Sequence, residues 1–139
     1  MSHANFIYEL NSNQTDTLVA LYQNEFWCHT RTRPDVDKML KNTDIVIGAI
    51  DENSKLIGFV CILTDFVYKA TIYDLIVHPH WRNQKLGQQL MEAVMNHPKL
   101  HGVEHFDLHC LPEMIPFYEK WGFTAELGEL GFMRRFQPA

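Results

Sequence analysis

The stretch that decides the fold is TIYDLIVHPHWRNQKLGQQL, residues 71–90. It begins with a mostly apolar run that predicts a buried strand, and Pro79 marks the exit from that strand. A polar loop follows, and Gly87 then opens an amphipathic helix. Free N–H groups at a helix start, together with the helix dipole, favour an anion. The order strand, loop, helix therefore predicts an anion-binding loop, to which Arg82 and Lys85 add positive charge.

The size and composition of the chain are those of one globular domain, predicted to span residues 1–139. With 46% hydrophobic and 21% charged residues, the chain has enough apolar side chains to build a core. It contains no apolar run of the ~20 residues that a membrane span needs. The net charge of −5 argues against a nucleic-acid partner, because such proteins usually carry a basic excess.

Cysteine usage and the N-terminal residues predict a cytoplasmic protein. The three cysteines are odd in number and form no CxxC pair, which indicates reduced thiols. The first residues lack the basic region and the apolar core of a signal peptide. We therefore expect a cytoplasmic location without contact to a membrane.

Two helices are expected upstream of the central stretch. A short strand at residues 6–10 precedes helix-capping residues at 11–13, and Pro34 with two nearby aspartates suits the start of a second helix. The side chains expected to form the buried stripes of these helices are Leu18, Leu21, Tyr22 and Phe26 in the first, and Val36, Met39 and Leu40 in the second.

An antiparallel hairpin is expected next. Residues 44–50 and 56–63 are apolar runs of strand type, and the turn residues 51–54 separate them. These runs are nearly continuous in apolar character rather than alternating. Such runs predict a sheet that is covered on both faces.

The downstream part of the chain completes an α/β pattern. Pro98 ends the helix of the central stretch, residues 103–110 alternate as in a strand, and Pro112 opens a further helix that Gly122 caps. Residues 123–136 are expected to form two short strands. Because the order of elements contains both hairpins and crossovers, it predicts an α/β fold with a mixed sheet.

Two segments carry chemistry when they are taken together: RNQKLG, residues 82–87, and FYEKWGF, residues 117–123. In this order they resemble the GCN5-related N-acetyltransferase (GNAT) superfamily, whose members move an acetyl group from acetyl-CoA to an amine. The first occupies the family's cofactor motif Arg/Gln-x-x-Gly-x-Gly/Ala, and the second matches its Phe-Tyr-x-x-x-Gly-Phe motif. The resemblance covers nearly the whole chain. It implies the GNAT fold, a mixed, mostly antiparallel central sheet flanked by helices on both faces, and local stretches also look like glucosamine-6-phosphate N-acetyltransferases.

The resemblance implies acetyl-CoA as the acetyl donor. The loop itself agrees, because a loop that leads into a helix start offers N–H donors to the CoA pyrophosphate. The residues expected to bind the donor are Leu75, Ile76, Val77, Arg82, Asn83, Gln84, Lys85, Leu86, Gly87, Gln88 and Tyr118. In the family, the strand residues among them offer backbone N–H groups to the acetyl carbonyl and to pantetheine.

Lys85 is a departure from the family motif, which has a glycine at this position. A side chain is tolerated there if the backbone keeps a negative φ. In that case only the approach of the pyrophosphate is affected.

Tyr118 is the expected general acid. Attack of the amine expels a CoA thiolate, and a phenol of pKa ~10 can protonate a thiolate of pKa ~8.5 when the two are held together. In the family the tyrosine of this motif has that role. An aromatic packing residue is the alternative, since Met114, Phe117 and Trp121 lie on the same helical face.

Asp74 is the first candidate for the general base. It interrupts an apolar strand, and a buried carboxylate is costly unless it is paired or has a functional role. In the family this strand often carries an acidic residue that contacts the amine or holds a water. Pairing of Asp74 with an arginine or with the backbone is an equal alternative, and Tyr73 or His78 could serve as the base instead.

The acceptor is expected to bind against the irregular segment 27–33, which walls the acceptor pocket in the family. Trp27, Arg31 and Asp74 are the expected substrate-binding residues, and Arg31 or Arg33 could hold a carboxylate or a phosphate. The acceptor is a small-molecule or peptide amine. An amino-sugar phosphate, an amino acid, a polyamine, an antibiotic and a protein amine all stay open.

No metal site is expected. The eight histidines lack ligand spacing with any cysteine, and Cys110 is expected to be a buried thiol. A non-catalytic acyl-CoA-binding regulatory module is the alternative of another class, against which Tyr118 argues. A homodimer is possible, with the C-terminal strands as its expected interface.

Overall fold

The computed structural model describes residues 4–138, and the chain divides into two compact units between Leu108 and His109. The first unit is built on a five-stranded sheet with the strand order β1-β2-β3-β4-β5. The strands are β1 (Asn5–Ile7), β2 (Ile45–Ile50), β3 (Leu56–Thr64), β4 (Lys69–Val77) and β5 (His105–Asp107). All neighbouring pairs are antiparallel except β4 and β5, which are parallel. The expected mixed, mostly antiparallel sheet is confirmed.

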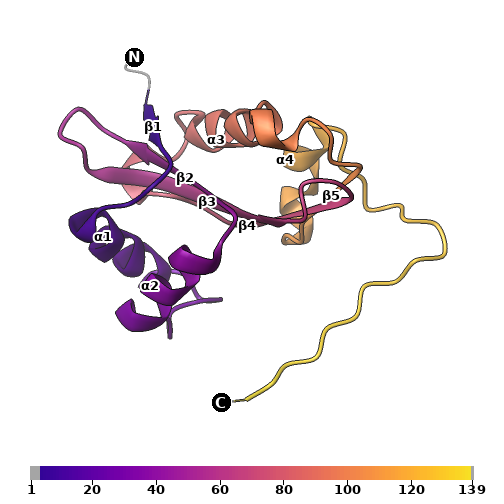
Figure 1. Ribbon diagram of the computed structural model, residues 1–139, viewed down its shortest axis with the longest axis horizontal. Coiled ribbons are helices and arrows are strands. Elements are labelled where there is room, and N and C mark those ends of the chain that lie inside the picture. Colours follow the sequence, from indigo (N-terminus) through magenta and orange to yellow (C-terminus); the bar gives the residue numbers. More distant parts are fainter. Residues whose placement is uncertain (1–3, 139) are drawn as a thin grey trace. The chain divides into compact units, whose positions relative to one another are not determined.

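Helices cover both faces of this sheet, as expected (Figure 1). On one face lie α1 (Ser12–Gln23) and α2 (Arg33–Asn42), and on the other lies α3 (Leu86–Met95). Neighbouring residues of β3 serve the two faces in turn. A Cβ added to Gly58 would meet Leu86 and Leu90 of α3. The Phe59 ring packs edge-on against the Tyr22 ring of α1, with 6.4 Å between the ring centres.

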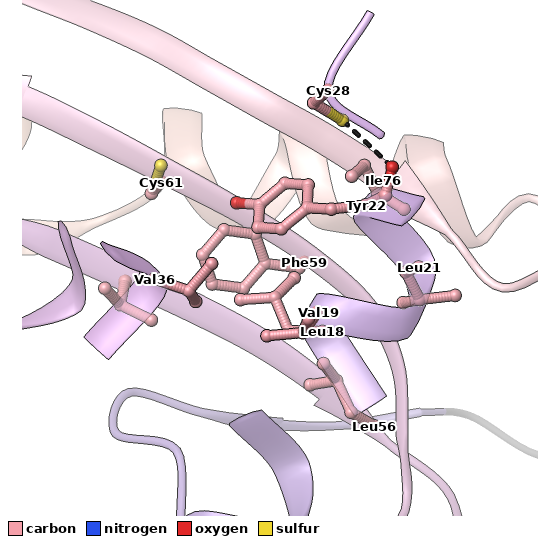
Figure 2. Packing of buried hydrophobic residues seen from close by; sticks show 11 residues of the cluster. Leu18, Val19, Leu21, Tyr22, Cys28, Val36, Leu56, Phe59, Cys61 and Ile76 are labelled. Atoms are coloured by element: carbon pink, nitrogen blue, oxygen red, sulfur yellow. Dashed lines mark hydrogen bonds between the residues drawn. The ribbon is translucent and has the colours of Figure 1, made fainter. Parts of the chain in front are cut away.

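The core between α1, α2 and the sheet is centred on Tyr22 and Phe59, both fully buried. Figure 2 shows the Tyr22 ring beside Phe59, with Ile76 of β4 and Cys61 of β3 close by. Burial of aromatic side chains of this size is a large share of the energy of a small core. Tyr22 is therefore a core residue whose polar hydroxyl must find a partner inside the protein.

The helix starts follow from the capping residues that the sequence contains. The Asn11 side chain accepts a hydrogen bond from the Gln14 N–H, and the Gln14 side chain accepts one from the Asn11 N–H, which is a capping box. Thr32 caps α2, with Pro34 in its first turn. One expectation was wrong: Phe26 is not part of the buried stripe, because α1 ends at Gln23, and its side chain is 71% exposed.

The end strands are shorter than expected from the sequence. β5 covers three residues of the expected run 103–110, because only Lys69 to Thr71 of β4 pair with it. Beyond Thr71 no further pair between these two parallel strands is formed. One edge of β4 therefore has no strand neighbour in the first unit from Ile72 onward.

The second unit contains a 3-10 turn (Pro112–Met114) followed by α4 (Ile115–Glu119). The centre of the Phe117 ring lies 5.0 Å from that of Tyr118 and 5.1 Å from that of Trp121. Gly122 has a φ of 86°, the left-handed conformation expected of a glycine after a helix.

The prediction of two short strands within residues 123–136 is wrong, since the structure has no strand between residues 123 and 138. A strand needs a neighbour to satisfy its backbone groups. Here only a turn from Leu127 to Leu130 is formed, and Gly128 takes a φ of 66°. The apolar side chains of this segment stay exposed, among them Leu130, Phe132, Met133 and Phe136.

Within residues 4–138, no helix has the length and apolar character required to cross a membrane. That the two units belong to one domain stays a prediction.

Gly58 gives a direct test of the α3 packing. We expect Gly58→Val to lower the free energy of unfolding by about 1–3 kcal/mol, because even a Cβ would lie 3.0 Å from Leu90 Cδ1 and 3.2 Å from Leu86 Cδ2. Urea denaturation followed by circular dichroism measures this change. Gly102→Ala is the control, since its Cβ would meet nothing within 4 Å, and an equal loss in both variants would contradict the packing argument.

Candidate active site

The centre of the candidate site is a β-bulge in β4. Cys61 of β3 is opposite Tyr73, and Phe59 is opposite Ile76, so Asp74 and Leu75 together oppose a single residue of β3. Asp74 has a φ of 57°, in the left-handed region that residues other than glycine rarely adopt. A bulge bends the strand and leaves backbone groups outside the regular ladder. It lies in the part of β4 that has already separated from β5, so backbone N–H groups of this segment can face a ligand.

Asp74 is held by two donors on the same oxygen. Tyr22 Oη donates to Asp74 Oδ2 at 2.9 Å, and Arg31 Nη1 donates to the same Oδ2 at 2.6 Å. The Asp74 side chain is 9% exposed and that of Arg31 is 35% exposed. A buried carboxylate is tolerated when it is paired and hydrogen-bonded. In the structure, Asp74 is thus paired with an arginine, as the alternative for this residue proposed. Its role as a general base stays a prediction.

Tyr22 is a site residue that the sequence analysis missed, because it fits the apolar stripe of α1. Burial raises its pKa far above the usual range, and the neighbouring Asp74 carboxylate raises it further. The hydroxyl therefore stays protonated and acts as a permanent donor to Asp74. Two signals could have found it: a buried tyrosine needs a partner for its hydroxyl, and an aspartate in an apolar strand needs a donor.

The Arg31 guanidinium is also held by aromatic rings. Its carbon lies 4.5 Å from the centre of the Tyr22 ring and 5.9 Å from that of Trp27, within cation–π range. The structure thus brings Trp27 and Asp74 together around Arg31, and their role in binding the acceptor stays a prediction. Arg33 is not part of it, because it forms ion pairs with Asp16 and Asp37 instead.

The two thiols beside this cluster are packing groups. Cys28 Sγ donates to the Tyr22 carbonyl at 3.4 Å, drawn in Figure 2. Burial raises the pKa of the Cys28 thiol to about 11, and it raises the pKa of Cys61 still further above its usual range. Both thiols stay protonated at neutral pH and are poor nucleophiles.

The loop after β4 leads into α3 as expected, with a 3-10 turn (Pro79–Trp81) at its start. α3 begins at Leu86, one residue before Gly87, and no side chain caps it. Its first N–H groups are therefore available to an anion. Asn83 and Lys85 both have a φ of 64°. The negative φ considered for Lys85 is thus wrong: the lysine itself takes the left-handed conformation that a glycine adopts more easily.

The Arg82 side chain is paired within the protein, and its expected role in binding the donor stays a prediction. Its Nη2 forms an ion pair with Glu25 Oε1 at 3.0 Å, and its Nε donates to the Val77 carbonyl at 3.2 Å. It therefore links the end of β4 to the segment after α1. Gln84 donates to the His80 carbonyl and Gln88 to Glu92, so both side chains support the loop and the helix from within.

Tyr118 lies in the second unit, half-buried between Phe117 and Phe123. Burial raises its pKa to about 12, with a smaller contribution from Cys110. The phenol therefore keeps its proton throughout the physiological range. Cys110 itself is half-buried rather than buried as expected, and burial again raises its pKa.

The structure offers no single base. His78 Nδ1 accepts a hydrogen bond from the His80 N–H, and burial lowers the pKa of His78, as do the nearby charges of His80, Lys55 and Arg82. His78 is therefore neutral at pH 7, but its Nδ1 is used to start the 3-10 turn. Tyr73 lies on β4, half-buried. In the part of the chain that the structure describes, no three His, Cys, Asp or Glu side chains are grouped so that they could hold a metal ion.

The Tyr22 hydroxyl is expected to matter for stability. Tyr22→Phe removes a donor from a buried carboxylate, and we expect the free energy of unfolding at pH 7 to fall by about 1–3 kcal/mol. Urea denaturation measures it. Tyr68→Phe makes the same chemical change at a side chain that is 61% exposed, so we expect no change there, and a Tyr22→Phe protein as stable as wild type would refute the role of the hydroxyl.

The strain at Lys85 leads to a second stability prediction. A non-glycine residue in the left-handed region costs about 1–2 kcal/mol, while glycine adds about 0.5–1 kcal/mol of chain entropy to be lost on folding. We expect Lys85→Gly to leave the free energy of unfolding unchanged or to raise it by up to about 1 kcal/mol. Asn83→Gly, at the same φ, is the control and gains less, because asparagine tolerates this conformation. A loss of stability in Lys85→Gly would contradict the strain.

The comparisons with known proteins agree with this geometry. The family model for the Acetyltransferase (GNAT) family matches residues 7–123. An uncharacterized N-acetyltransferase ycf52 of Pyropia yezoensis is 31% identical over 125 residues, which are 84% of this chain and 70% of that protein. The crystal structure of a putative GNAT acetyltransferase from Xanthomonas campestris matches with a TM-score of 0.85 and 26% identity, covering 99% of this chain and 96% of that one.

A glucosamine-6-phosphate N-acetyltransferase from Arabidopsis thaliana has the same fold. Its TM-score is 0.75 at 18% identity, with 98% of this chain and all of that chain covered. At this identity the likeness supports the fold alone. The family match over most of the sequence decides the assignment: the chain belongs to the GNAT family of N-acetyltransferases.

Proposed function

We propose that this chain transfers the acetyl group of acetyl-CoA directly to a primary amine. The observation that carries the proposal is the bulge at Asp74 and Leu75, where β4 separates from β5. It brings together a strand edge without a neighbour in the first unit, a buried carboxylate and, eleven residues after Leu75, an uncapped helix start at Leu86. The family implies acetyl-CoA as the donor.

The donor would bind along β4 and the loop into α3. Backbone N–H groups of Leu75, Ile76 and Val77 are proposed to hold the acetyl carbonyl and pantetheine. Developing charge on the carbonyl oxygen would be stabilised there. The pyrophosphate would meet the first N–H groups of α3 and the charge of Lys85, in the loop comprising Arg82, Asn83, Gln84, Lys85, Leu86, Gly87 and Gln88. The uncapped start of α3 fits this use, since α1 and α2 are both capped by side chains.

The chemistry needs two proton transfers. The amine nitrogen attacks the thioester carbon, the C–S bond breaks, and the leaving thiolate takes a proton that we assign to Tyr118. The raised pKa of Tyr118 keeps this proton in place until a thiolate forms. The same burial would raise the pKa of a thiol beside it, as it does for Cys110, and so keep donor and acceptor matched.

The base is the less defined partner. The ammonium form of the acceptor must lose one proton before the attack. Asp74 is proposed to bind the amine and to accept this proton, directly or through water. Because Arg31 and Tyr22 both donate to Oδ2 of Asp74, an amine that binds this oxygen would have to share it with these two donors. His78, neutral at pH 7, is the second candidate.

The acceptor is proposed to be a small-molecule or peptide amine, bound against Trp27 and Arg31. An amino-sugar phosphate is one candidate, and two observations are compatible with it: the local sequence resemblance and the exposed part of Arg31. Neither a nucleic acid nor a membrane is proposed as a partner, given the net charge of −5.

Three further proposals concern the whole chain. We place the protein in a reducing compartment such as the cytoplasm, which the three free cysteines support. We take residues 1–139 as one domain, since the family match runs across the boundary between the two units. A homodimer is proposed through the C-terminal segment, whose exposed apolar side chains would be covered there.

The role of Tyr118 is open to a direct test. We expect Tyr118→Phe to lower kcat by about 10²-fold or more and to leave the KM for acetyl-CoA within about twofold, since only proton transfer to the thiolate is lost. Release of free thiol over a panel of amines measures both. Tyr8→Phe, at a side chain that is 60% exposed, is the matched control.

An unchanged kcat in Tyr118→Phe would remove the tyrosine from the mechanism. If the wild-type protein binds CoA tightly but releases no thiol with any class of amine, the non-catalytic module replaces the enzyme as the best account.

A further inference from the structure

Arg31 differs from the other arginines near the site in having an open donor edge. In the described residues its hydrogen bonds leave from Nη1 alone, to Asp74 Oδ2 and weakly to Met39 Sδ. The side chain is 35% exposed. A guanidinium presents five N–H donors in a plane, and the Nε and Nη2 edge suits the two oxygens of a carboxylate or phosphate. Arg33 and Arg82 are each committed to carboxylates of the protein.

This edge is held in place before any ligand binds. The guanidinium lies over the Tyr22 ring, which is fully buried and fixed in the core. The Trp27 ring, which belongs to the same segment after α1 as Arg31, lies 5.9 Å from the guanidinium carbon and is 46% exposed. Because little side-chain freedom remains to be lost, an anion that reaches Arg31 gains affinity without a large ordering cost.

The ion pair also limits which amines can use Asp74. An ammonium group alone would have to compete with a guanidinium that lies 2.6 Å from Oδ2. It would also approach a positive charge. An acceptor that carries both an ammonium and an anionic group can place the ammonium against Asp74 and the anion against Arg31. It adds one ion pair to each partner, and the Coulomb terms of both partners then favour binding.

We propose that the acceptor is an amine that carries its own carboxylate or phosphate, that this anion binds the open edge of Arg31, and that the amine binds Asp74 beside the Arg31–Asp74 ion pair. This inference rests on the proposed function and names the substrate class of the same site. Asp74 directly precedes Leu75 in the bulge, so an amine bound to Asp74 would lie next to the backbone assigned to the acetyl group. Arg31 is then the specificity-determining residue.

The test uses matched amines that differ only in the anion. Glucosamine 6-phosphate against glucosamine tests a phosphate, and glycine against glycinamide tests a carboxylate. We expect wild-type protein with saturating acetyl-CoA to show a kcat/KM at least about tenfold higher for the anionic member of one pair, measured by thiol release. The pair that shows the difference identifies the anion.

The variants separate recognition from folding. We expect Arg31→Gln to reduce this ratio to about one, and Arg31→Lys, which keeps the charge beside Asp74 but loses the planar fork, to reduce it severalfold. Arg31→Lys keeps the test valid if Arg31→Gln fails to fold. Arg33→Gln is the matched control and keeps the wild-type ratio. A ratio near one in wild type, or a ratio that survives in both Arg31 variants, overturns the proposal.

A binding measurement separates this inference from the proposed function. Isothermal titration of wild-type protein with each amine in the presence of CoA should show at least about tenfold tighter binding of the anionic member, and Arg31→Lys should weaken that preference. Preference in binding without thiol release supports the anion site and overturns acetyl transfer. Thiol release with equal binding and equal kcat/KM for both members supports acetyl transfer and overturns the anion site.

Discussion

One buried charge organises this structure. Asp74 sits at a left-handed position in the middle of an apolar strand, 9% exposed, and a carboxylate there is stable only because Tyr22 and Arg31 donate to it. The requirement fixes more than a side chain. It sets the depth at which α1 packs, since the Tyr22 hydroxyl must reach Oδ2, and it holds the segment after α1 through Arg31. Removing Arg31 would leave the carboxylate without an opposite charge, and removing the Tyr22 hydroxyl would take away one of its two donors.

The same bulge explains how one sheet serves both folding and chemistry. At Ala70 and Thr71, β4 pairs on both sides and behaves as an interior strand. Beyond Thr71 its outer edge has no neighbour in the first unit, and the extra residue at Asp74 and Leu75 turns the strand there. A regular ladder would have consumed the N–H groups that an acetyl carbonyl needs. The fold thus gives up strand pairing at the point where the proposed reaction takes place.

Much of the fold could be predicted because local signals agreed with the final packing. Asn11 and Gln14 form the capping box at the start of α1, and the turn at residues 51–54 joins the expected hairpin. The expectations that failed depended on distant neighbours. Phe26 has the spacing of a core residue, yet α1 ends before it. The C-terminal segment has strand-like apolar residues, yet no strand pairs with it within residues 4–138. For the candidate site, Trp27, Arg31 and Asp74 were named from the sequence, whereas Tyr22 was missed because its ring fits the apolar stripe of α1.

The ion pair between Arg82 and Glu25 connects the two halves of the proposed site. Glu25 belongs to the segment that carries Trp27 and Arg31, and Arg82 belongs to the loop between β4 and α3. A phosphate of the donor that competes with Glu25 for Arg82 would release this segment. Conversely, an acceptor that holds the segment in place would stabilise the ion pair, and the phosphate would then bind Arg82 less easily. By thermodynamic linkage the two effects are equal. If the proposed donor and acceptor sites are correct, the two affinities would therefore be coupled through this ion pair, whose strength decreases as salt concentration rises.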